Sequence, residues 1–140
     1  MCQLVANISG NALENAIIFE AMQSNRELLE DLAFRDSLTR LYNHQQFHVR
    51  FEEEFSRAKR YGLPLTCIFT DIDDFKNIND QFGHIVGDVA LKQIGKIINQ
   101  ILRKSDIAAR TGGDEFAVLL PNTSYTGGKD FADRLSDMIR

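Results

Sequence analysis

The fold is decided by residues 107–120, IAARTGGDEFAVLL, in which two apolar runs flank a short turn. The pattern predicts strands over Ile107 to Thr111 and Phe116 to Leu120, joined as a hairpin. We expect the paired glycines to supply the positive φ values that a tight turn needs. Two acidic residues, Asp114 and Glu115, stand at the tip, where their carboxylates are available for chemistry.

A second acidic group follows another expected strand. Residues 63–70, LPLTCIFT, form an apolar run with β-branched and aromatic members, which is typical of a central strand. Asp71 and Asp73 come directly after it. If this strand and the hairpin are neighbours in one sheet, their carboxylates suit Mg²⁺ better than zinc, because no His/Cys cluster accompanies them. The alternative is that each acid is an ordinary turn residue.

Helical periodicity accounts for much of the remaining sequence. Phenylalanines spaced four apart predict a helix over Asn43 to Tyr61, with capping side chains offered by residues 36–39, DSLT. Residues 75–82 form a polar connection with helical turns, and Gly87-Asp88 precedes an amphipathic helix. Another helix begins at Phe131. The fold class is therefore α/β, with a central, mainly antiparallel sheet flanked by helices.

Residues 1–35 predict a long N-terminal helix. Alternating three- and four-residue steps mark one seam, formed by Val5, Ile8, Ala12, Asn15, Phe19, Met22, Arg26, Leu29 and Ala33. One interpretation is a helix packed on its own domain, and the other is a parallel dimer helix or signalling linker. We place the domain boundary between residues 1–35 and 36–140.

Composition limits the possible partners and setting. With 140 residues and a net charge of −4, the chain is one domain with an appendage and lacks a basic field for extended nucleic acid. Cys67 lies in an apolar run, which favours a buried, reduced thiol and a cytoplasmic location. No segment has the apolar length of a membrane span, so we expect no membrane contact by this chain.

Four motifs resemble those of GGDEF diguanylate cyclases in order and spacing. They are residues 36–43, DSLTRLYN, residues 71–80, DIDDFKNIND, Gly83-His84 with Gly87-Asp88, and residues 112–116, GGDEF. The resemblance implies a palm-like fold related to nucleotide cyclases and polymerases. It also implies bacterial second-messenger signalling, in which two GTP molecules become cyclic di-GMP and two pyrophosphates. Because each domain of the family holds one GTP, a homodimer is implied as well.

The resemblance implies a metal site at the two acidic motifs. Asp71 and Asp114 would hold Mg²⁺, or alternatively Mn²⁺, with the carbonyl of Ile72 as a further oxygen ligand. Glu115 has two candidate roles, a second metal contact or the acceptor of the hydroxyl proton. The sequence does not separate these roles.

The resemblance also implies residues that bind GTP. Phe75 and Lys76 would meet the phosphates through backbone N–H groups, and Lys76 would add a point charge. Asn79 and Asp88 would read guanine, since a carboxylate accepts from its N–H groups and an amide both donates and accepts. Without the family, Asn79 would be interpreted as a turn former and Asp88 as a helix cap.

Arg103-Lys104-Ser105-Asp106 matches the Arg-x-x-Asp inhibitory site of many cyclases of this family, where product binds and restrains the enzyme. Arg103 offers a planar fork for phosphate or a guanine edge, and Asp106 offers an acceptor. The alternative is that Arg103 complements a helix C-terminus.

Some features depart from the family. Arg40 stands where glycine is frequent and His44 where arginine is frequent, and family members continue beyond the position of Arg140. Residues 5–16 resemble the last helix of a GAF sensory domain. The leading hypothesis is an active cyclase. The alternatives are a catalytically inactive GGDEF module that binds GTP or cyclic di-GMP, and a product-sensing or dimerisation module.

Overall fold

The computed structural model describes residues 2–140, and it describes side chains for residues 13–26, 29–31 and 33–140. The chain divides after Ala33 into two compact units. The first contains nearly all of the helix α1 (Cys2–Phe34), as its periodicity predicted. None of the helices in the described residues has the length and apolar character that a bilayer crossing requires.

The described part of α1 exposes much of its apolar surface. Arg26 Nε donates to Glu30 Oε1 at 2.9 Å. The seam positions 5, 8 and 12, with most of the GAF-like stretch, lie outside the described side chains. The exposed large apolar side chains are Leu13, Ile17, Ile18, Phe19, Met22, Leu29 and Phe34.

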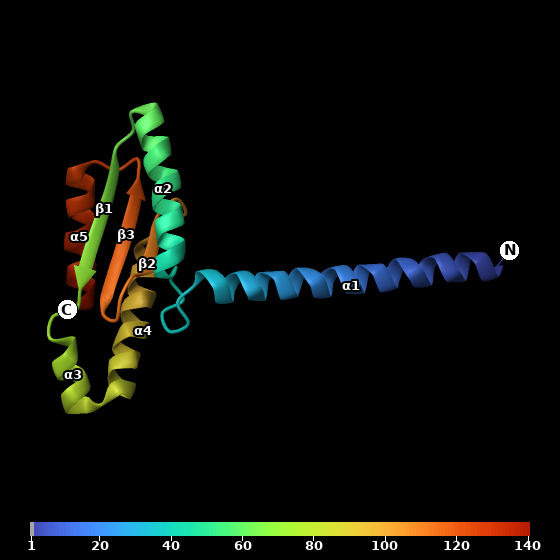
Figure 1. Ribbon diagram of the computed structural model, residues 1–140, viewed down its shortest axis with the longest axis horizontal. Helices are drawn as coiled ribbons and strands as arrows, with labels where there is room; N and C mark the ends of the chain where they lie inside the picture. The colour runs from blue at the N-terminus through green and yellow to red at the C-terminus, as the bar shows by residue number, and fades with distance from the viewer. Residues whose placement is uncertain (1) are drawn as a thin grey trace. The chain divides into compact units, whose positions relative to one another are not determined.

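The second unit is built on a three-stranded antiparallel sheet. Its strands are β1 (Leu65–Asp71), β2 (Ile107–Arg110) and β3 (Glu115–Pro121), in the order β1-β3-β2. Because β1 and β3 run in opposite directions, the end of β1 and the tip of the β2–β3 hairpin lie at the same edge of the sheet (Figure 1). The expected neighbourhood of the two acidic motifs is thereby confirmed.

Helices cover both faces of this sheet. The helix α2 (His44–Tyr61) packs on one face, and α4 (His84–Ile101) and α5 (Tyr125–Ile139) pack on the other. Alternation along β3 sends successive side chains to opposite faces. Phe116, Val118 and Leu120 join the α4 and α5 core, whereas Ala117 and Leu119 join the core beneath α2. The α/β class with helices flanking an antiparallel sheet is confirmed.

Several helix ends differ from the sequence-based expectations. Asn43 caps α2 by accepting from the Gln46 N–H at 2.9 Å, so the DSLT segment does not serve as its cap. The helix α4 begins at His84, three residues before Gly87, after Gly83 with φ 83°. The interpretation of Asp88 as a helix cap is therefore wrong. The helix α5 begins at Tyr125, earlier than expected, because Ser124 caps it.

Candidate functional site

Asp71 and Glu115 form the centre of the candidate site. They are directly opposite each other in the β1–β3 register, so their side chains project from the same face of the sheet. Both line a cavity of about 560 Å³ beside α2, together with His44 and Phe69. Asp114 is half-buried and precedes Glu115 in the chain. The fold thus brings the predicted carboxylates of both acidic motifs to one edge of the sheet.

The hairpin turn uses its glycines differently from the expectation. Neither Gly112 nor Gly113 has a positive φ, so that prediction is wrong. A Cβ atom at Gly112 would lie 2.5 Å from Glu115 Oε2. The absence of a side chain at Gly112 therefore makes room for the Glu115 carboxylate against the turn.

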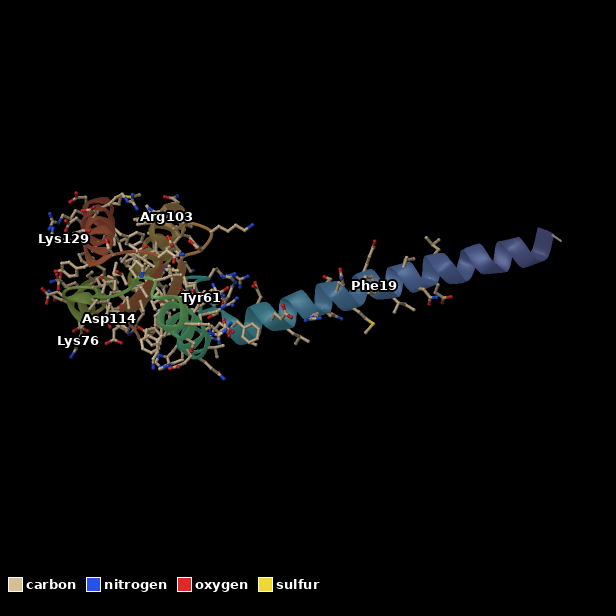
Figure 2. The ribbon with its side chains drawn as sticks, turned by 90° about the horizontal axis from the view of Figure 1, so that it is seen from above. Phe19, Tyr61, Lys76, Arg103, Asp114 and Lys129 are labelled. Carbon is tan, nitrogen blue, oxygen red and sulfur yellow. The ribbon has the colours of Figure 1, made fainter. Side chains whose placement is uncertain are left out.

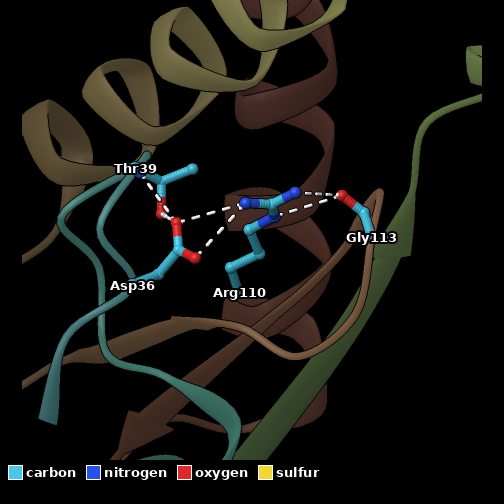
Figure 3. Close-up of polar contacts among 4 residues, drawn as sticks. All are labelled: Asp36, Thr39, Arg110 and Gly113. Carbon is cyan, nitrogen blue, oxygen red and sulfur yellow. Dashed lines mark hydrogen bonds and ion pairs between the residues drawn. The ribbon is translucent and has the colours of Figure 1, made fainter. Parts of the chain in front are cut away.

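Arg110 ties the hairpin tip to the segment before α2 (Figure 3). Its Nε and Nη2 donate to the Gly113 carbonyl at 3.1 and 2.6 Å, and its Nη1 donates to Asp36 Oδ2 at 3.2 Å. Asp36 Oδ1 also accepts from the N–H and the hydroxyl of Thr39, each at 2.8 Å. This network fixes the turn that carries Asp114, because Gly113 is the neighbouring residue.

The Asp36 carboxyl has a lowered pKa. Burial alone would raise this pKa, but the hydrogen bonds from Thr39 and the nearby Arg110 guanidinium together hold it below the ordinary value of 3.8. A carboxyl whose pKa is lower in the folded state stabilises the fold when it is ionised. This contribution is complete above about pH 4 and is lost as the pH falls through the folded-state pKa.

Replacing Asp36 by asparagine is expected to lower the free energy of unfolding by about 1–3 kcal/mol at pH 7, because partly buried Arg110 loses a charged partner. The difference from the wild type should shrink as the pH falls below about 4, because the carboxylate becomes protonated as the pH passes through its folded-state pKa. Urea titrations at pH 7 and pH 3 measure both values. The exposed Asp137→Asn change is the control, and an Asp36→Asn difference that is equal at the two pH values contradicts the assignment.

The segment after β1 places the predicted phosphate contacts at the start of α3 (Phe75–Phe82). The Phe75 N–H donates to the Ile72 carbonyl at 3.3 Å, so two of the predicted ligand groups pair with each other. Asp74, just before the helix, has φ 54° and no side-chain cap bond. The side chain of Lys76 is exposed at the first turn of α3, near the same edge of the sheet as Asp114 (Figure 2).

The predicted guanine contacts come from two helices that pack against each other, Asn79 from α3 and Asp88 from α4. Asn79 is half-buried over Gly87, and a Cβ atom at Gly87 would lie only 2.0 Å from Asn79 Oδ1. Asp88 follows Gly87 in α4 and is exposed. Glycine at position 87 therefore allows the Asn79 amide to lie against α4 at the residue before Asp88.

Arg103 and Asp106 lie away from these residues. Figure 2 shows Arg103 and Asp114 at opposite sides of the second unit in that view. The Asp106 carboxylate accepts from the Arg103 N–H at 2.9 Å and from the Ser105 hydroxyl at 3.3 Å, which closes the turn between α4 and β2. Both residues line a cavity of about 250 Å³. The structure thus separates the predicted inhibitory residues from the predicted catalytic ones.

The carboxylates suit an open site for a hard cation. Among the residues that the structure describes, no group of three or more His, Cys, Asp or Glu side chains is arranged to enclose a metal. Mg²⁺ needs only one or two carboxylates, because waters and substrate phosphates supply its other ligands. The opposed Asp71 and Glu115, with Asp114 beside them, fit this requirement.

Two residues of the site were not predicted in these roles. Asp36 was interpreted as a helix cap, and Arg110 was assigned no role. In the structure the two residues pair with each other, although they are 74 positions apart in sequence. A cation two positions before the paired glycines was the available signal for Arg110. Arg40 adopts φ 64°, a left-handed conformation that glycine adopts freely, which gives a physical reason for the family's frequent glycine there.

Comparison with known proteins gives consistent results. The family model described as "Diguanylate cyclase, GGDEF domain" matches residues 33–140. A diguanylate cyclase of Vibrio cholerae serotype O1 is 46% identical over 115 residues, which is 82% of this chain and 35% of that protein. Diguanylate cyclase DgcP of Pseudomonas aeruginosa is 43% identical over 120 residues, 86% of this chain and 18% of that protein. The chain thus spans a minor part of both relatives.

A solved structure shares the fold. It is the GGDEF domain of DgcB from Caulobacter crescentus, in complex with c-di-GMP. The match has a TM-score of 0.72 and 29% sequence identity, and it covers 74% of this chain and 58% of that chain. This similarity supports the palm-like interpretation of the fold.

Proposed function

The chain belongs to the GGDEF family of diguanylate cyclases, and we propose that it condenses two GTP molecules into cyclic di-GMP and two pyrophosphates. The observation that carries this proposal is the opposition of Asp71 and Glu115 at the edge where Asp114 also lies. All three carboxylates of the predicted centre are present: Asp71 and Glu115 lie on neighbouring strands, and Asp114 lies in the turn just before Glu115. The relatives named diguanylate cyclase support the same reaction.

The residues of this chain bind and orient GTP in the proposed reaction. The Asp88 carboxylate accepts hydrogen bonds from the guanine N–H groups, the Asn79 amide both donates to and accepts from guanine, and Lys76 places a positive charge near the phosphates. The 3′-hydroxyl of one GTP attacks the α-phosphorus of the other. A new P–O bond forms, the bond to the bridging oxygen breaks, and pyrophosphate leaves. Two such transfers close the ring, so positioning supplies much of the acceleration.

A magnesium ion held by Asp71 and Asp114, with the Ile72 carbonyl as a further ligand, would neutralise phosphate charge during this displacement. The same hard oxygen ligands also suit Mn²⁺, which is the alternative ion. Glu115 retains its two candidate roles. If Glu115 accepts the hydroxyl proton, Glu115→Gln removes the acidic limb of the pH–rate profile. If it is a second metal contact, the variant weakens the dependence on metal concentration instead.

The reaction requires two half-sites, so we propose that the protein acts as a homodimer held by α1. The exposed apolar side chains of this helix, among them Phe19, Met22 and Leu29, support a parallel helical pair. Sedimentation of the protein under reaction conditions tests this assembly. A strictly monomeric protein that still forms product contradicts it.

Incubation with GTP and Mg²⁺ tests the proposed function. Cyclic di-GMP and pyrophosphate should appear in a ratio of one to two, as measured by chromatography and a pyrophosphate assay, and a chelator should stop the reaction. Parallel titration with GTP measures binding. A dimeric protein that binds GTP and forms no product contradicts the cyclase and favours the inactive, nucleotide-binding module.

A further inference from the structure

The cavity near Arg103 is lined by two parts of the chain that are distant in sequence, and each part forms one wall. It lies between the turn that joins α4 to β2 and the segment that follows α1 in sequence. Three cationic side chains and one carboxylate surround it, so it favours an anion that also carries hydrogen-bonding groups. The polar lining residues are Arg35, Tyr42, Asn99, Arg103, Lys104 and Asp106.

Arg35 is held in place on this second wall. Its guanidinium carbon lies 4.9 Å from the centroid of the Tyr42 ring, and its Nη1 donates to the Arg40 carbonyl at 2.9 Å. Tyr42 is itself fixed, because its N–H donates to the Ala108 carbonyl at 3.0 Å and its carbonyl accepts from the Arg110 N–H at 2.9 Å. An arginine that is already oriented loses less side-chain entropy when it binds a ligand.

We propose that Arg35 is a ligand-contacting residue of this cavity and binds a phosphate of cyclic di-GMP together with Arg103. This inference rests on the proposed function, because that function supplies the ligand. The cavity volume of about 250 Å³ is below the range of about 300–1,000 Å³ common for sites that enclose a drug-sized molecule. The cavity therefore receives one end of the dinucleotide, where two guanidinium groups meet the phosphate from both walls.

Binding in this cavity also restrains the segment that follows α1. Arg35 is the first residue after the last residue of α1, Phe34. A ligand that bridges Arg35 and Arg103 ties residues 35–43 to the α4–β2 turn. Product binding should therefore slow amide exchange in residues 35–43, because local opening would require the ligand contacts to break.

Calorimetric titration of the full chain with cyclic di-GMP tests the role of Arg35. We expect Arg35→Gln and Arg103→Gln each to weaken binding by about tenfold or more, since each loses a charge-assisted hydrogen bond. Arg35→Lys should bind with intermediate affinity, because it keeps the charge but loses the planar fork. Lys129→Gln, at an exposed site on α5, is the control and should bind as the wild type does. Thermal unfolding checks that each variant is folded.

Wild-type affinity in folded Arg35→Gln overturns the proposal, whether or not Arg103→Gln is impaired. Hydrogen exchange gives a second measurement: the protection of residues 35–43 should appear in the wild type and be absent from Arg35→Gln at a ligand concentration that saturates both. Equal protection in both proteins also overturns it. Initial rates from GTP, taken before product accumulates, test the proposed function separately. A protein that makes no product but loses cyclic di-GMP binding in Arg35→Gln refutes the cyclase and leaves the cavity assignment intact.

Discussion

Product formation should fall by at least about 10²–10³-fold when Asp114 is replaced by asparagine, if this carboxylate stabilises the charge of the reacting phosphates. Asp114 is half-buried at the hairpin tip beside the opposed Asp71 and Glu115. An amide has nearly the same shape but no negative charge. The change therefore tests the charge of the site while leaving its packing unaltered. Initial rates of cyclic di-GMP formation at saturating GTP and Mg²⁺ measure the effect.

The stability of Asp114→Asn should match that of the wild type. The Asp114 carboxylate takes part in none of the hydrogen bonds or ion pairs of the described residues. Asp130→Asn, on the exposed face of α5, is the matched control and should retain full activity. A folded Asp114→Asn enzyme with more than about a tenth of wild-type activity would contradict a catalytic or metal-binding role for this carboxylate.

The hairpin could be predicted because its determinants are local. Apolar runs and a polar turn lie next to each other in residues 107–120, and the register then places Glu115 opposite Asp71. The role of the glycines could not be obtained in this way. Gly112 is needed for the close approach of Glu115, and this contact depends on side-chain conformation rather than on turn type.

The contacts between distant segments could not be predicted from pattern alone. Asp36 and Arg110 are far apart in sequence, and their pairing follows from the bridge that sets Tyr42 beside Ala109 in the sheet. The same bridge also brings Arg35 to the cavity near Arg103. The resemblance indicated which motifs belong to the site, but the links that hold the motifs together are properties of the tertiary structure.

The start of α4 could not be predicted from the sequence pattern either. Glycine is a poor helix former, so Gly87 was expected before the helix. The structure places it at the end of the first turn of α4, because Gly83 ends α3 and begins α4. The reason for glycine at position 87 is tertiary: the Asn79 side chain occupies the space where a Cβ atom would be.

If Asn79 contacts guanine as proposed, replacing Gly87 by alanine is expected to raise the KM for GTP by about 10- to 100-fold, because the displaced amide would lose these hydrogen bonds. The new Cβ atom would lie 2.0 Å from Asn79 Oδ1 and 3.2 Å from Phe75 Cζ, so the amide has to rotate away. The helix itself should not suffer, since alanine favours a helix interior by about 1 kcal/mol over glycine. Steady-state kinetics and thermal unfolding measure the two effects.

A double-mutant cycle decides whether Gly87 acts through Asn79. Asn79→Ala should raise the KM by a similar factor, and Gly87→Ala added to Asn79→Ala should cause little further increase, because the clashing amide is already absent. Independent effects would instead multiply. If the double variant shows the product of the two single effects, Gly87 has another role and the placement of Asn79 at guanine loses its support. If Gly87→Ala binds GTP normally, the space above Gly87 is not where the amide acts.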